Sequence, residues 1–236
     1  MRKSGLIIPG NIFGSDDAHA VNFREVRMGN IAPKTLYRSS HPIKDNKQEK
    51  IISLLAASTG IAAVVNLSDT ASGLAAKAHF APWYNKLLAN NQVIALGMDF
   101  SNTSDGFKKK LKKGLQFIAA TEGPWLIHCH AGVDRTGFFS IVLEALMGAT
   151  VDEIVHDYLQ SFNSIFDSNI HGGNKKNELV VMRLLSVMGD YIEINDQNLQ
   201  AIAERYLITI IKLSAEEMDL LKKNLAGVMI RPDIIK

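Results

Sequence analysis

The chain has 236 residues, of which 47% are hydrophobic and 21% are charged, and its formal net charge is +2. These values are typical of a globular protein that buries a sizeable core, and they give no support for nucleic-acid binding. The single cysteine excludes an internal disulfide framework. Because no apolar run reaches transmembrane length, and Pro9 and Gly10 interrupt the first one, we expect a cytoplasmic protein; an exported effector without a cleaved signal would have the same features.

The amino-terminal part is predicted to contain little regular structure. Residues 1–20 mix Gly, Pro, Asn, Asp and Ser with isolated apolar residues, so we expect an irregular leader with one short strand at Leu6 to Ile8. Residues 22–42 follow, and they carry Arg24 and Arg38. We interpret these arginines as structural ties between the first strands and loops near the functional site.

Helix and strand signals then alternate as far as residue 120. Apolar residues at helical spacing are separated by short β-branched runs. The predicted elements are, in chain order, a helix at 45–58, a strand at 61–67, a helix at 73–90, a strand at 93–98 and a helix at 107–120. Asp69 and Asp99 follow the strands, at the end of a parallel sheet where ligands bind. The lysine run at 108–113 is interpreted as a solvated helix face.

Residues 124–137 contain the only cysteine, Cys129, and have the pattern of a strand, a tight loop and the start of a helix. Unpaired N–H groups and the positive end of the macrodipole converge at a helix amino terminus, which suits a phosphate oxygen or a thiolate. Arg135 lies six residues after Cys129, which lets the loop surround one phosphoryl group. A guanidinium can bind two of the phosphate oxygens at once.

Helices dominate the remainder. Residues 138–147 are apolar on nearly all sides, and Thr150 and Glu153 form a capping box that opens the next helix. A looser stretch at 161–177 is expected to be the most mobile segment, and the further helices are predicted at 178–191, 195–213 and 214–225. We therefore expect one α/β domain over residues 1–236, with a central, largely parallel sheet flanked by helices and a mostly helical carboxyl-terminal part at 148–236.

His128, Cys129, Arg135, Thr136 and Gly137 match the pattern H-C-x5-R-[S/T]-G, and here the sequence resembles the cysteine-dependent protein tyrosine phosphatases. Within that superfamily, the loop HCxAGxDRTG and residues 22–42 resemble a bacterial branch that acts on phosphotyrosine and, in some members, on phosphoinositides. The resemblance implies a phosphatase that needs no metal and no other cofactor, and that works through a phosphocysteine intermediate.

The resemblance assigns roles to the residues of this loop. Cys129 would attack phosphorus as a thiolate, Arg135 would bind the phosphate, and Thr136 would donate its hydroxyl to the sulfur. His128 would hold the loop from behind. The phosphate-binding residues would be His130, Ala131, Gly132, Val133, Asp134 and Arg135.

The general acid is harder to assign, because the Trp-Pro-Asp of the family is absent. The strand end at 96–99 resembles the family's position for this aspartate, so Asp99 is the expected acid. Asp134, Asp69 and Asp105 are the alternatives.

We expect the substrate to be a phosphotyrosine protein or peptide, with dual specificity included. Family members that act on phosphoinositides often carry Lys where Val133 stands, so a phosphoinositide or inositol polyphosphate is the alternative substrate. A phosphate-binding pseudophosphatase is less favoured because Cys129 and Arg135 are both present. Sulfur or arsenate chemistry on a related loop is disfavoured by the Arg-Thr-Gly that closes this one.

Overall fold

The sheet at the centre of the molecule is mostly parallel. The computed structural model describes residues 21–43, 47–77, 81–166, 175–190 and 192–228, together with two short strands at 6–8 and 11–13. The central sheet has five strands in the order β3-β4-β7-β5-β6, and only β3 runs antiparallel to its neighbour. Its strands are β3 (Arg24–Glu25), β4 (Leu36–Ser39), β5 (Ala63–Asn66), β6 (Val93–Ala95) and β7 (Trp125–His128).

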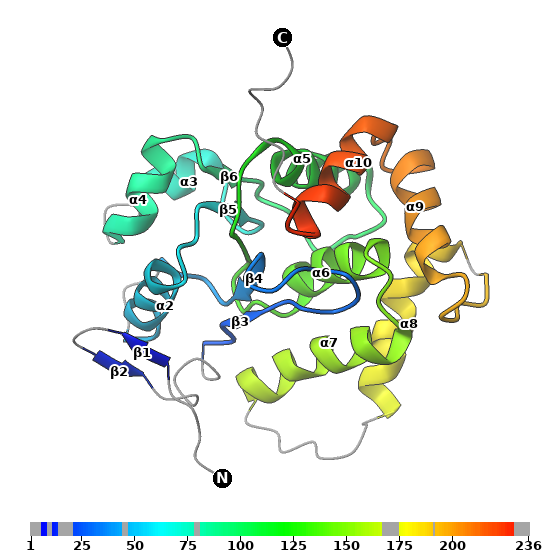
Figure 1. Cartoon of the computed structure of the whole chain (residues 1–236), viewed down its shortest axis with the longest axis horizontal. Coiled ribbons are helices and arrows are strands. Elements are labelled where there is room, and N and C mark those ends of the chain that lie inside the picture. Colours follow the sequence, from blue (N-terminus) through cyan, green and yellow to red (C-terminus); the bar gives the residue numbers. More distant parts are fainter. Residues whose placement is uncertain are drawn as a thin grey trace.

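Helices cover both faces of this sheet (Figure 1). One side carries α2 (Lys47–Ser58), α3 (Ala71–Ala75) and α4 (Pro82–Ala89). The other side carries α5 (Asp105–Ala120), α6 (Asp134–Leu146), α7 (Val151–Phe166), α8 (Lys175–Gly189), α9 (Leu199–Thr209) and α10 (Ala215–Leu225). The predicted fold class, an α/β sheet with a helical carboxyl-terminal layer, is confirmed.

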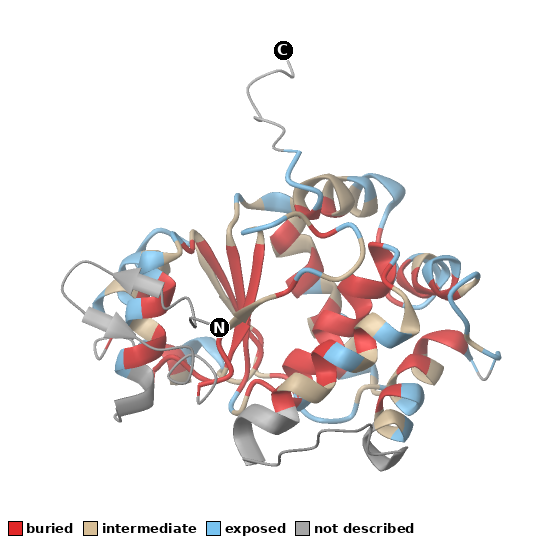
Figure 2. Ribbon diagram, turned by 60° about the horizontal axis from the view of Figure 1, so that its bottom comes forward, coloured by how far each residue is buried: buried red, intermediate tan, exposed pale blue. Residues whose placement is uncertain are grey.

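The alternation of side chains along the strands divides the core between the two faces. Val64 and Leu126 pack with α2 and α4, whereas the next residues along, Val65 and Ile127, pack with the helices of the opposite face. The central strands are buried throughout (Figure 2). In α6 every residue from Arg135 to Leu146 is buried, as its predominantly apolar sequence predicts.

Three sequence-based expectations need correction. The strand predicted at Leu6 to Ile8 is confirmed as β1 (Leu6–Ile8), but the leader has a second strand that was not expected, β2 (Asn11–Phe13), which pairs antiparallel with β1. The single helix expected at 73–90 is divided into α3 and α4. Pro82 is at the start of α4, where the N–H that proline lacks would have no helical partner.

The third correction concerns the loose stretch expected at 161–177. Helix α7 continues to Phe166 and α8 already begins at Lys175, while residues 167–174 lie outside the described part of the chain.

The capping box at Thr150 and Glu153 is confirmed, because each residue's side chain bonds the other's backbone N–H. None of the described helices has the length and the hydropathy needed to cross a bilayer.

Candidate active site

Residues 129–135, called the cysteine loop below, connect the carboxyl end of β7 to the amino end of α6. Because β4, β7 and β5 are parallel, the loops that follow them gather at the same edge of the sheet. The Cys129 side chain is buried there, and its Sγ accepts a hydrogen bond from the backbone N–H of Gly132 at 3.3 Å. A thiolate in this position faces the positive end of the α6 dipole.

Gly132 is required by the shape of the loop. Its φ of +74° lies in the left-handed region, and a Cβ at this position would come within 2.4 Å of the carbonyl oxygen of Ser39. The backbone of the cysteine loop at Gly132 therefore packs directly against the end of β4.

Arg135 is held by the segment that follows β6. Its Nη1 donates to the carbonyl oxygen of Met98 at 3.0 Å, and its guanidinium carbon lies 4.5 Å from the centre of the Phe100 ring. In the sequence, Asp99 lies between the two residues that make these contacts, Met98 and Phe100. Thr136 is fully buried in the first turn of α6, and its hydroxyl has no hydrogen-bond partner among the described residues.

The expected acid and its closest rival are both exposed to solvent. Asp99 accepts a hydrogen bond from the backbone N–H of Ser101 at 2.9 Å, and Asp134 is the first residue of α6. Asp99 is flanked in the sequence by Met98 and Phe100, which both contact Arg135, and Asp134 directly precedes Arg135 in the sequence.

The other two candidate acids are placed differently. Asp69 accepts hydrogen bonds from His41 Nε2 at 2.7 Å and Asn66 Nδ2 at 2.9 Å. Burial alone would raise the pKa of Asp69, but these bonds lower it well below its ordinary value, so the carboxylate stays ionised and is a poor acid. Asp105 is 90% exposed at the start of α5, and its carboxylate lies 3.8 Å from Lys108 Nζ.

His128 lies behind the cysteine loop and is fully buried. Its Nε2 is 3.0 Å from the hydroxyl of Tyr84, and its Nδ1 is 3.3 Å from the carbonyl oxygen of Cys129. Burial, followed by the neighbouring His41, lowers the pKa of His128 well below its ordinary value, so the ring is neutral. This is the position expected of a residue that holds the loop, whereas His130 is exposed at its rim.

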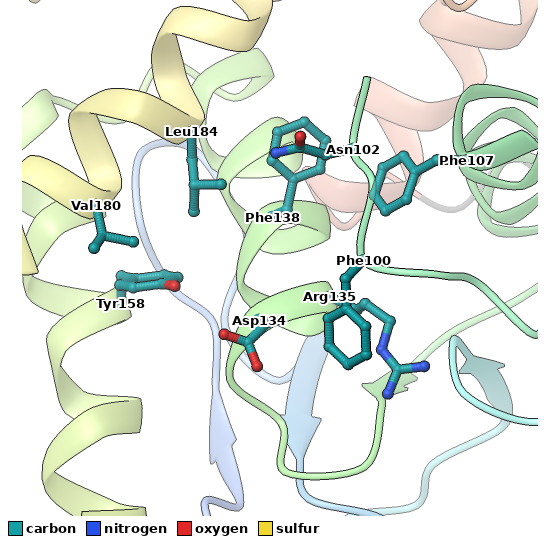
Figure 3. A pocket seen from close by; sticks show the side chains of 9 residues that line it. All are labelled: Phe100, Asn102, Phe107, Asp134, Arg135, Phe138, Tyr158, Val180 and Leu184. Atoms are coloured by element: carbon teal, nitrogen blue, oxygen red, sulfur yellow. The ribbon is translucent and has the colours of Figure 1, made fainter. Parts of the chain in front are cut away.

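A pocket of about 260 Å³ opens beside Arg135, between α6, α7 and α8 (Figure 3). Its lining is mainly aromatic and aliphatic, and Arg135 is the only cation among the described lining residues. The lining residues are Phe100, Asn102, Phe107, Asp134, Arg135, Phe138, Tyr158, Val180 and Leu184. Val133 is buried elsewhere in the loop, at 3% exposure, and does not line the pocket.

A buried ionic cluster supports the outer side of the loop. Asp157 on α7 accepts hydrogen bonds from Arg24 Nε at 2.9 Å and from Arg38 Nη1, and Arg38 Nη2 donates to the carbonyl oxygen of Gly132 at 2.9 Å. The interpretation of Arg38 as a structural tie is therefore confirmed. Asn22 donates to the same carbonyl at 3.0 Å.

Sequence analysis missed Asn22, Tyr84 and Asp157. For Asp157 a signal was present, because this acid lies within the apolar stripe of α7 beside Ile154 and Tyr158, which are both buried. A buried acid needs a cationic partner, and the two arginines upstream are the natural candidates. For Asn22 and Tyr84 the sequence alone carries no comparable signal.

Individual known proteins are similar to parts of this chain. The chain is 45% identical over 64 residues to the triple specificity protein phosphatase PtpB of Mycobacterium tuberculosis; the match covers 27% of this chain and 22% of that protein. The core catalytic domain of the PP-IP phosphatase SIW14 from S. cerevisiae, solved with citrate, aligns with a TM-score of 0.42 at 17% identity over 74% of this chain and 96% of that one. A second structure of the Siw14 catalytic core aligns with a TM-score of 0.40 at 15% identity, over 80% and 99%.

The family match covers more of the chain than each of these individual matches. The family described as the tyrosine phosphatase family matches residues 18–227, a span that includes the central sheet, the cysteine loop and the helices that pack around them. This chain belongs to the tyrosine phosphatase family.

Proposed function

We propose that the chain is a cysteine-dependent phosphomonoester hydrolase that acts on phosphotyrosine in proteins or peptides. One observation carries the proposal: the only cysteine has its sulfur at the amino end of α6, where a loop N–H donates to it, in a loop that ends in Arg135. This arrangement suits a thiolate nucleophile and an arginine that binds the transferred phosphoryl group. A nucleophilic thiol must stay reduced, so we propose that the protein works in the cytoplasm.

The proposed reaction has two steps. The Cys129 thiolate attacks phosphorus, the bond to the ester oxygen breaks, and the leaving phenoxide takes a proton from the general acid. A water molecule then attacks the phosphocysteine and gives its proton to the same carboxylate, the P–S bond breaks, and phosphate leaves. The Thr136 hydroxyl has no hydrogen-bond partner among the described residues, and we propose that it donates to the departing thiolate.

We propose Asp99 as the general acid. Its neighbours Met98 and Phe100 both contact Arg135, so a phosphate bound to that arginine lies beside the segment that carries Asp99. Asp134 remains the rival, since it lines the pocket. Asparagine at position 99 would keep the bond that the side chain accepts from Ser101 and would remove only the proton donor.

The pocket favours an aryl phosphate over an inositol phosphate. Phenylalanine rings and aliphatic side chains suit a flat apolar leaving group, whereas a polyphosphate needs several cations. Among the described residues of the cysteine loop, Arg135 is the only arginine, and the loop contains no lysine.

The test is phosphate release, without added metal, from a phosphotyrosine peptide, a phosphoserine peptide, a phosphoinositide and inositol hexakisphosphate. Phosphotyrosine should be hydrolysed fastest, and Cys129→Ser should abolish release. Asp99→Asn should lower kcat by about 10²-fold or more and remove the basic limb of the pH profile, as expected when a general acid is lost. Asp134→Asn makes the same change at the rival acid and should keep the basic limb.

Each other outcome changes a different part of the proposal. Faster release from an inositol substrate would replace the substrate class. A loss of the basic limb in Asp134→Asn instead of Asp99→Asn would move the acid to α6. No release from any substrate, with phosphate binding retained, would make the chain a binding protein.

A further inference from the structure

We propose that Asn22, Arg38 and Asp157 form a positioning network that holds the outer face of the cysteine loop, so that the loop N–H groups face Cys129 and the substrate phosphate. These residues lie outside the motif that marks the active site. The inference rests on the function proposed above, because it assigns a role in binding and activating groups of that same site.

The carbonyl groups of the loop are tied to groups outside it. Asn22 Nδ2 donates to the carbonyl oxygen of Gly132 at 3.0 Å and lies 3.5 Å from that of Ala131. The preceding carbonyl, that of His130, accepts the backbone N–H of His41 at 3.1 Å. Successive peptide groups are therefore fixed on one side.

A peptide group fixed at its oxygen is also fixed at its N–H. In a trans peptide the C=O and N–H bonds point in opposite directions, so a carbonyl held outward turns the N–H of the same group inward. The peptide between Ala131 and Gly132 shows this arrangement, since its N–H reaches Cys129 Sγ at 3.3 Å. The next peptide, whose oxygen Asn22 and Arg38 share, turns the Val133 N–H the same way.

The donors on the outer face are themselves held in place. Arg38 and Asp157 are each 1% exposed, and Arg38 uses one guanidinium nitrogen for Asp157 and the other for Gly132. Arg24 bridges the remaining members, because it donates to both Asp157 and the Asn22 amide oxygen. Burial would raise the pKa of Asp157, but Arg38 and Arg24 lower it to about 2, so the anchoring carboxylate is ionised.

A contribution to stability does not by itself explain why Arg24, Arg38 and Asp157 are buried together. Buried ion pairs often contribute no more to stability than well-packed apolar residues would, because removing the charges from water is costly. The cluster does, however, fix one geometry, and a phosphate-binding loop needs fixed N–H groups before the substrate arrives.

The test uses the fact that alkylation reports on one thiol only, since Cys129 is the only cysteine. The rate of reaction with iodoacetamide is measured against pH, and protection by inorganic phosphate gives its dissociation constant. Neither measurement needs turnover, so a wild type that hydrolyses nothing would overturn the proposed function and leave this test intact.

Asn22→Gly is the first variant. Asn22 has a φ of 53°, and glycine tolerates this left-handed conformation, so the substitution removes the amide without straining the backbone. We expect the pH midpoint of alkylation to rise by about one unit, which is a tenfold change in an equilibrium constant. We expect the dissociation constant for phosphate to rise by a similar factor, roughly tenfold. kcat should fall by more than KM rises. Arg38→Lys should shift the same quantities, because lysine cannot bridge Asp157 and Gly132 with a planar fork.

Ser161→Ala is the matched control. Ser161 is fully buried and accepts a hydrogen bond from Arg24 at 2.9 Å, so its loss costs stability in the same cluster without touching the cysteine loop. It should lower Tm and leave the alkylation midpoint unchanged. If Asn22→Gly does not fold, Asn22→Asp keeps the size and turns the donor into an acceptor that repels the loop carbonyls. An unchanged midpoint and unchanged phosphate protection in a folded Asn22 variant would overturn the proposal.

Discussion

At the scale of single residues, the tautomer of His128 is determined by its neighbours. The neutral ring has one donor and one acceptor, and the carbonyl of Cys129 can only accept, so Nδ1 carries the hydrogen and Nε2 accepts from the Tyr84 hydroxyl. Asn66 Nδ2 then donates to that hydroxyl at 3.2 Å. A continuous chain of hydrogen bonds thus supports the loop from the sheet side.

Tyr84→Phe should therefore cost about 1–3 kcal/mol of unfolding free energy, because it leaves a buried His128 nitrogen without its donor. Urea unfolding measures this loss. Tyr206→Phe is the matched control: Tyr206 is 2% exposed and its hydroxyl has no partner among the described residues, so its removal should cost nothing or stabilise the protein. Equal losses in the two variants would show that the hydrogen bond to His128 contributes nothing.

What the sequence predicted at this scale depended on local spacing. Cys129 and Arg135 lie within one short motif, so their joint placement could be inferred without knowing the fold. The bond from Asn22 to Gly132 spans 110 positions and that from Arg24 to Asp157 spans 133, and no local pattern encodes either. Pairing over such distances is decided by the topology of the sheet.

At the scale of elements, α5 and α6 pack through a glycine. A Cβ on Gly114 would lie 2.7 Å from a ring carbon of Phe139, closer than real contacts allow, so the two helices meet where a side chain is missing. Gly106 lies on the same helix, and a Cβ there would meet only the Ser104 hydroxyl at 3.9 Å.

Gly114→Ala should accordingly destabilise the protein by about 1–3 kcal/mol, the usual cost of overpacking, even though alanine is the better helix former by about 1 kcal/mol. Gly106→Ala, the control, should be neutral or slightly stabilising. Thermal unfolding of the two variants separates packing from propensity. A stabilised Gly114→Ala would mean that α5 shifts freely along α6.

The elements themselves were largely predictable, because apolar periodicity is a local property. The helix at 150 was located from its capping residues, and the structure confirms that box. The helix predicted at 214–225 also begins with a capping box, formed by Ser214 and Glu217. The errors fall where a local rule was outweighed by something else. The predicted helix at 73–90 ran through Pro82, where α4 in fact begins, and the loose stretch was predicted to begin at 161 although the helix continues to Phe166.

At the scale of the whole molecule, the active site depends on contacts from two adjacent strands at one edge of the sheet and from the helical layer. β3 contributes Arg24, β4 contributes Arg38, and α7 contributes Asp157, and all three meet at the outer side of the cysteine loop. The global stability of the protein should therefore respond to the ionisation of this cluster, which includes one further carboxyl group.

Glu144 on α6 is that group, and it is fully buried. Burial, followed by the Asp157 carboxylate, raises the pKa of Glu144 well above its ordinary value, so the folded protein holds a proton that the unfolded chain releases above about pH 4.5. Stability rises with pH only where the unfolded state binds more protons, and here the folded state does. Glu144 therefore lowers stability as the pH increases from 4.5 towards neutral. Asp157 acts in the opposite sense and in a separate window, losing its contribution as the pH falls towards 2.

Glu144→Gln should remove the first of these effects, because glutamine has the shape of the protonated acid and no charge at any pH. The variant should unfold with a free energy close to that of the wild type near pH 4 and become progressively more stable than it towards pH 7.5, by at most about 1.4 kcal/mol per pH unit for a single proton. Urea unfolding at several pH values measures the difference, and Glu122→Gln, at an exposed position, controls for the substitution itself. Curves that stay parallel from pH 4 to 7.5 would show that Glu144 ionises alike in both states, and that the cluster at the outer side of the cysteine loop carries two anions rather than one.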